Sequence, residues 1–149
     1  MSLSEHSYVP VVLADRPYPR LIHPLHAFLL AGTLTLFLGA LICDIAYFES
    51  AEVQWKNFAS WLIVGGLVFG GFALLCSVID LFRHGGGVRR PILYFLLLLA
   101  VWVLGFGDEL IHAKDAWASM PESLYVSAIV ALLAILATGL GLSTLRTGA

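Results

Sequence analysis

Four long apolar stretches constrain the fold of this chain more than any other feature. They cover about residues 26–48, 58–82, 91–111 and 123–145, and the last of them contains no charged residue. A helix needs about 20 apolar residues to cross a hydrocarbon core about 30 Å thick. The stretches do not alternate between apolar and polar residues as the strands of a membrane barrel do, so each one is predicted to be a transmembrane helix.

The composition supports a membrane location for the whole chain. Of the 149 residues, 60% are hydrophobic and only 12% are charged, whereas soluble domains carry roughly 25% charged residues. The connections between the stretches are short, which favours antiparallel neighbours. We therefore predict an all-α integral membrane protein, with a polar arm at residues 1–22 and a four-helix up-down bundle at residues 23–146. The net charge of −2 gives no basic field that would attract nucleic acid.

The distribution of Lys and Arg predicts the orientation of the bundle. Loops on the cytoplasmic side of a membrane carry an excess of these residues. Two lie on one side of the predicted bundle, Lys56 in the predicted loop Glu49–Asn57 and Lys114 in the predicted loop at about His112–Ser123. Six lie on the other side: Arg16, Arg20, Arg83, Arg89, Arg90 and Arg146. Both termini are therefore expected in the cytoplasm, with the protein in a bacterial inner membrane.

Small residues on the predicted helices indicate close packing. Gly66 and Gly70 form a GxxxG step in the second stretch. The fourth stretch has small residues on one stripe, namely Ser127, Ala131, Ala134, Thr138 and Gly141. We interpret both as packing surfaces within the bundle, with a homo-oligomer interface as the alternative.

Polar residues inside a membrane are costly and are candidates for function. Asp108, His112 and Asp115 follow one another at i, i+4 and i+7, so they share one face at the outer end of the third helix. Asp44 and Glu109 are expected at the same depth. Imidazole and carboxylate ligands suit zinc, iron or manganese, so these residues are a candidate metal site. The alternative is an acidic outer rim in which the neighbouring carboxylates stabilise the histidine.

The inner side has a different set of candidates. His23, His26 and His84 are expected at one depth, where two of them could serve as axial ligands of a b-type haem. The alternative is a capping or interfacial role for these histidines. His26 and Asp44 lie 18 residues apart, or five helical turns, and therefore point along the same face. Asp80 is either a functional carboxylate or an interfacial partner of Arg83.

The first two stretches resemble a known family. The segments IHPLHAFLLAGTLTLFLGALICDIAYF and WLIVGGLVFGGFALLCSVIDLF are similar to the predicted bacterial membrane family known as domain of unknown function 2231, and HAKDAWASMP is similar to one of its subgroups. The matching polar positions are His23, Asp44 and Asp80. The resemblance implies four helices and covers residues from about 20 to 145. Because some members of the family resemble fusions to redox modules, it also implies a role beside periplasmic electron carriers.

Three functional hypotheses follow, and no catalytic motif points to an enzyme. The first is a redox-associated membrane subunit or anchor that binds haem or quinone, or that docks a periplasmic redox protein. The second is a transporter or channel for a small solute, although no carboxylate lies at the midplane, where ion-coupled transporters usually have their sites. The third is a scaffold that assembles with a partner and has no catalytic role.

Overall fold

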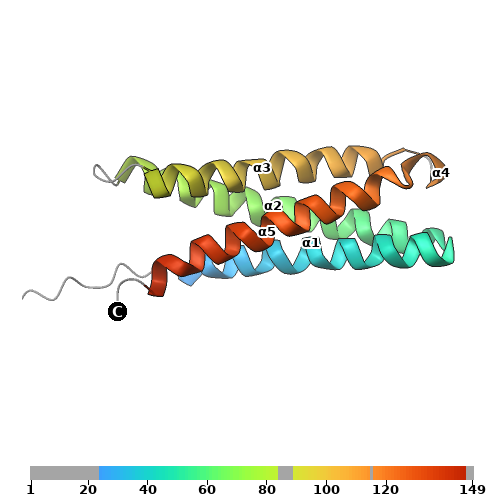
Figure 1. The fold of residues 1–149 in the computed structure, drawn as a ribbon, viewed down its shortest axis with the longest axis horizontal. Helices are drawn as coiled ribbons and strands as arrows, with labels where there is room; N and C mark the ends of the chain where they lie inside the picture. Colours follow the sequence, from blue (N-terminus) through green and yellow to red (C-terminus); the bar gives the residue numbers. More distant parts are fainter. Residues whose placement is uncertain (1–23, 84–88, 115, 147–149) are drawn as a thin grey trace, which may run out of the picture.

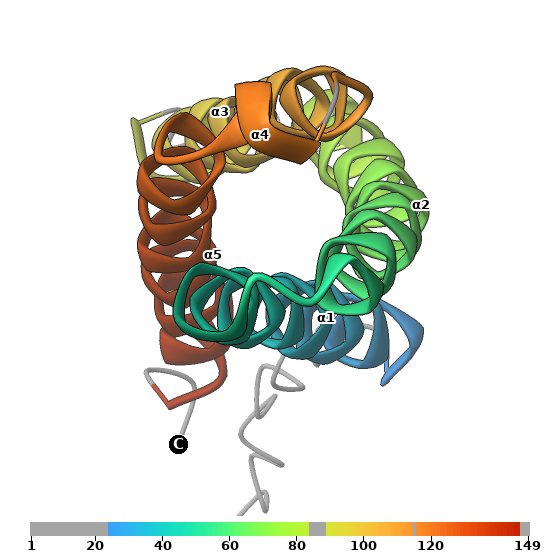
Figure 2. The ribbon, with the colours of Figure 1, turned by 90° about the vertical axis from the view of Figure 1, so that its right-hand side faces the viewer.

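The computed structural model describes residues 24–83, 89–114 and 116–146, which are almost entirely helical. Four long helices form the bundle, and a short helix, α4, lies across one end (Figures 1 and 2). The helices are α1 (Pro24–Ser50), α2 (Val53–Arg83), α3 (Arg89–His112), α4 (Ala116–Ser119) and α5 (Glu122–Arg146). The four predicted stretches lie within the long helices.

The outward faces of the bundle are apolar. Large side chains such as Phe28, Ile42 and Trp61 are between 62% and 70% exposed in the isolated chain. Each of the four long helices is long and apolar enough to cross a membrane. Lipid tails would cover these faces, whereas exposure of so much apolar surface to water would be unfavourable. The prediction of an all-α, four-helix membrane bundle is confirmed.

The connection between α1 and α2 is shorter than the sequence suggested. Ala51 adopts a left-handed conformation, with φ of 55°, and its amide donates a hydrogen bond to the Tyr47 carbonyl at 2.8 Å. This is the αL cap that ends many helices, usually with glycine at this position. Because the chain turns so sharply, α2 already begins at Val53, and Lys56 belongs to a helix rather than to the expected loop.

The core is built mainly from aliphatic side chains, with the Phe37 ring near its middle. Leu30, Ile63 and Leu98 are almost completely buried. Phe37 packs where two glycines make room for it. A Cβ atom on Gly105 would lie 2.8 Å from the Phe37 ring, and one on Gly66 would lie 3.1 Å from it. The GxxxG step is therefore filled by α1 of the same chain.

The second half of the bundle repeats the first with a constant offset. Helices α1 and α3 stand at opposite corners of the bundle (Figure 2), and two hydrogen bonds cross between them. His26 bonds to Tyr94, and Asp44 bonds to His112; both pairs are separated by 68 residues in the sequence. The same offset relates other buried positions: Leu30 to Leu98, Thr33 to Val101, Ala59 to Ser127 and Ile63 to Ala131.

The bundle therefore consists of two helical hairpins. The first hairpin is α1 with α2, and the second hairpin is α3 with α5. We call the end where α1 finishes the Asp44 end, and the end where α1 begins the His26 end. In Figure 1 the Asp44 end lies to the right, beside α4, and α5 finishes near the start of α1 at the His26 end.

Candidate functional site

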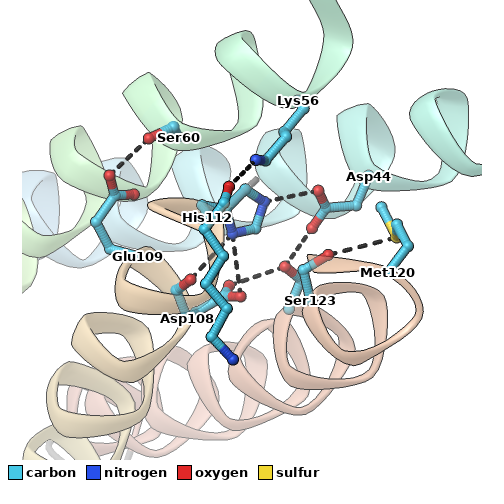
Figure 3. A network of polar contacts seen from close by, with 10 residues as sticks. Asp44, Lys56, Ser60, Asp108, Glu109, His112, Met120 and Ser123 are labelled. Carbon is cyan, nitrogen blue, oxygen red and sulfur yellow. Dashed lines mark hydrogen bonds and ion pairs between the residues drawn. The ribbon is translucent and has the colours of Figure 1, made fainter. Parts of the chain in front are cut away.

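A group of buried polar side chains joins three helices near the Asp44 end. We call it the carboxylate cluster: Asp44 of α1, Asp108 and His112 of α3, and Ser127 of α5. Asp44 and Asp108 are 0% exposed, His112 is 5% exposed and Ser127 is 2% exposed. Asp44 lies about 9 Å along α1 from the end of that helix, at 1.5 Å per residue. The cluster is thus inside the bundle and below its rim. Figure 3 shows the Asp44, Asp108 and His112 side chains turned toward one another.

His112 is held by both of its ring nitrogens. Nδ1 lies 3.0 Å from the backbone carbonyl oxygen of Asp108, one turn earlier on α3. A carbonyl oxygen only accepts hydrogen bonds, so Nδ1 carries a hydrogen. Nε2 lies 2.9 Å from Oδ1 of Asp44 across the bundle. The helical bond fixes the ring so that its far nitrogen faces α1.

Ser127 connects the two carboxyl groups. Its Oγ atom is within hydrogen-bond distance of Oδ2 of Asp44, and it lies 2.8 Å from Oδ2 of Asp108. The hydroxyl has one hydrogen and can donate it to only one of the two oxygens. An ionised carboxylate cannot donate in return. The second contact is therefore a hydrogen bond only if the other carboxyl group is protonated.

Counting hydrogens over the whole cluster leads to a defined net charge. Four links need four hydrogens: His112 to the Asp108 carbonyl, His112 to Asp44, and Ser127 to each carboxyl group. Neutral His112 and Ser127 supply two of them. The other two either make His112 a cation beside one protonated carboxyl group, or protonate both carboxyl groups beside a neutral His112. The net charge of the cluster is then zero, which is what burial in a medium of low dielectric favours.

Two neighbouring side chains of α2 also form hydrogen bonds near the cluster. Lys56 is 9% exposed, and its Nζ donates a hydrogen bond to the Lys114 carbonyl at 2.5 Å. One turn further along α2, the Ser60 hydroxyl donates to Oε1 of Glu109 at 2.6 Å. These two contacts join α2 to α3 beside the cluster.

The structure brings some of the predicted site residues together and separates others. Asp108 and His112 do share a face, but they do not form an exposed acidic rim, because their side chains point into the bundle and meet Asp44. Asp115 lies outside the described residues. Among residues 24–83, 89–114 and 116–146, no group of three or more His, Cys, Asp or Glu side chains is placed to hold a metal ion. The metal site stays a prediction.

The predicted haem ligands also remain untested. His23 and His84 lie outside the described residues. His26 is 4% exposed, and its Nε2 atom lies 2.7 Å from the Tyr94 hydroxyl oxygen, so a hydrogen bond occupies this nitrogen. Asp80 of α2 lies near this pair and acts electrostatically on both residues.

The sequence did not identify two residues around the cluster. Ser127 was interpreted only as a small residue on a packing stripe, and Lys56 was placed in a loop. One sequence signal does point to Ser127: it is the first residue of the small-residue stripe on α5, and it lies at the depth expected for the carboxylates. No spacing rule, however, relates it to Asp44, which lies 83 residues earlier.

Comparison with known proteins identifies the family. The model of a family described as a predicted membrane protein, DUF2231, matches residues 22–146. The chain belongs to this family. The matched range of the DUF2231 protein contains all four long helices and every residue of the carboxylate cluster, and the family resemblance noted in the sequence is confirmed. No curated protein and no solved structure is significantly similar to the chain.

Proposed function

We propose that this DUF2231 protein is a membrane subunit that binds and releases one proton at the carboxylate cluster in support of a redox partner. The hydrogen count at Ser127 carries the proposal, because the observed contacts require one more proton than two ionised carboxylates provide. A buried proton that two groups share is a proton that the site can gain or lose. Ionisable groups inside membranes commonly serve proton transfer.

Ser127 gives the proton two positions within the cluster. When Asp108 is the acid, its proton points at Ser127 Oγ, and the serine hydroxyl donates to Asp44. When Asp44 is the acid, both hydrogen bonds reverse. The transfer moves the neutral carboxyl group between α3 and α1 without a change in the net charge. His112 holds Asp44 in place in both arrangements through its bond to Oδ1.

The redox part of the proposal rests on the resemblance to family members that are fused to redox modules. The proposal also adopts the predicted topology, in which both termini lie in the cytoplasm of a bacterium and the Asp44 end lies at the periplasmic face. A periplasmic electron carrier would dock at that end, close to the cluster. Electron transfer in the docked partner would change the charge at this face, and uptake of a proton by the carboxylate cluster would compensate for it.

Infrared spectroscopy of the purified full-length protein tests the proton directly. We expect a carbonyl stretch from a protonated carboxylic acid that shifts in D₂O and disappears in the Asp44→Asn/Asp108→Asn double variant. Glu122→Gln is the matched control, because Glu122 forms an exposed ion pair with Lys114 at 3.6 Å. Absence of the band from the wild-type protein at neutral pH would refute proton binding. A colourless protein that binds no added quinone would refute the redox part alone.

A further inference from the structure

The His26 end is closed by a contact that corresponds to the one in the cluster. His26 and Tyr94 join α1 to α3 at the same 68-residue offset as Asp44 and His112. Their rings meet edge to face, with centroids 5.9 Å apart. Each end of the bundle therefore has a histidine that bridges the two hairpins across the same diagonal.

The two ends differ in how many polar contacts join their helices. At the Asp44 end, Asp44 bonds to His112, Ser127 contacts both carboxyl groups, and α2 bonds to the end of α3 through Lys56 and to Glu109 through Ser60. At the His26 end, the bond between His26 and Tyr94 joins α1 to α3, and the buried Nδ1 atom of His26 has no hydrogen-bond partner in the part of the chain that the structure describes. Burial of such an atom is unfavourable, and contact with water would remove the penalty. The closed His26 end is therefore held by fewer contacts than the closed Asp44 end.

Tight packing around the bridge keeps water out while this end is closed. A Cβ atom on Gly141 of α5 would lie 2.8 Å from Leu30 and 3.2 Å from the Tyr94 ring. A water molecule needs a site with room and two or more polar partners. Because Nδ1 of His26 is itself buried, water can reach it only if the helices at this end move apart.

The half of the bundle behind the bridge contains further polar groups. Thr33 of α1, Ser77 of α2 and Thr138 of α5 are all buried in the half that leads to the His26 end. Thr33 donates to the Leu29 carbonyl at 2.8 Å, so its oxygen can still accept a hydrogen bond from water. Beyond these hydroxyls the core around Phe37 and Ile63 is apolar.

We propose that the two hairpins separate at the His26 end and admit water to the adjoining half of the bundle from that face only. The carboxylate cluster and Lys56 hold the Asp44 end closed during this movement. The opening gives the protein a one-sided, water-filled entrance that ends at the apolar middle of the core. It is independent of the proton that the cluster binds.

The two native cysteines can report the opening of each end in the full chain. Cys43 of α1 is buried beside Asp44, and Cys76 of α2 is partly buried near Tyr94; both are free thiols. A maleimide reacts with a thiol that water can reach and ionise. Tyr94→Phe removes the hydroxyl of the bridge with little change in shape. We expect it to speed the modification of Cys76 about fivefold, the equilibrium factor that one neutral hydrogen bond represents, and to leave Cys43 unchanged.

A double variant and a wedge variant separate this movement from a loss of folding. His26→Leu/Tyr94→Phe replaces the bridge by an apolar contact and removes the unpaired nitrogen, so Cys76 should react more slowly than in the wild type. Gly141→Ala should push the hairpins apart at this end and speed Cys76. Tyr125→Phe, at an exposed hydroxyl of the other end, is the control. Unchanged Cys76 rates in both Tyr94→Phe and Gly141→Ala, or an equal rise at Cys43, would overturn the proposal.

Discussion

The two ends of the bundle solve the same structural problem with different chemistry. Each end joins α1 to α3 across the interior at the same offset of 68 residues. At the Asp44 end, three helices contribute to a network of four polar links that needs no net charge. At the His26 end, the hydrogen bond between His26 and Tyr94 joins α1 to α3. A repeated backbone frame thus supports one end that is strongly fastened and one that is weakly fastened.

The strongest way to break this comparison is to remove the histidine from the carboxylate cluster. His112→Leu leaves Asp44 buried without its imidazole partner. Loss of one member of a buried charged group costs about 3–5 kcal/mol. The corresponding change at the other end, His26→Leu, removes a single neutral hydrogen bond and should cost only about 1–2 kcal/mol. Thermal unfolding in detergent measures both, and equal losses would contradict the difference between the two ends.

Ser127→Ala tests the bridge between the two carboxyl groups. The substitution leaves one oxygen on each carboxyl group without its hydroxyl partner, so we expect a destabilisation of about 1–3 kcal/mol. The infrared band of the protonated carboxyl group should also change its frequency. Ser77→Ala is the matched control, because Ser77 is a buried serine on α2 in the other half of the bundle. A control that loses as much stability as Ser127→Ala would show that the bridge has no special role.

The middle of the core lies between the two ends, so substitutions there should change the stability of the protein without depending on the contacts at either end. Gly105→Ala places a methyl group 2.8 Å from the Phe37 ring, and overpacking of this kind costs about 1–3 kcal/mol. Gly107 lies two residues away on α3, and a Cβ atom on it would meet no other atom within 4 Å. Gly107→Ala should instead stabilise the helix by about 0.5–1 kcal/mol. Chemical denaturation compares the two, and effects of the same sign would contradict the packing described around Phe37.

The smallest expected effect lies in the turn at the Asp44 end. Ala51→Gly places glycine where the backbone is left-handed, with φ of 55°. Relief of the Cβ clash should stabilise the protein by about 0.5–1 kcal/mol after the greater freedom of the unfolded glycine is subtracted. The change should raise the unfolding temperature without altering the modification of Cys76. A lower unfolding temperature would mean that Ala51 is not strained.

Hydropathy was sufficient to predict the fold, because each apolar stretch exceeds the length that a membrane requires. The four-residue spacing of Asp108 and His112 was also sufficient to place them on one face. Depth was harder to predict. A carboxylate close to a helix end can turn toward water or toward the interior, and the choice depends on what the other helices offer. Ser127 offers a hydroxyl to both Asp44 and Asp108, and no local pattern in the sequence reports a contact between such distant residues.

The position where a helix begins was also hard to predict from the local sequence. Lys56 follows a polar segment, so the sequence placed it in a loop, but the left-handed turn at Ala51 starts α2 early enough to include it. The Lys56 ammonium then lies at the carboxyl-terminal end of α3, where free carbonyl groups attract a cation. This contact depends on the packing of two helices and has no signature in either helix alone.

The constant offset between the hairpins has a consequence for the order in which they are connected. Because α1 begins and α5 finishes at the same end, a chain that ran through the second hairpin before the first would need only a short new link. A circular permutant that begins with α3 and ends with α2 should therefore keep the same arrangement of four helices.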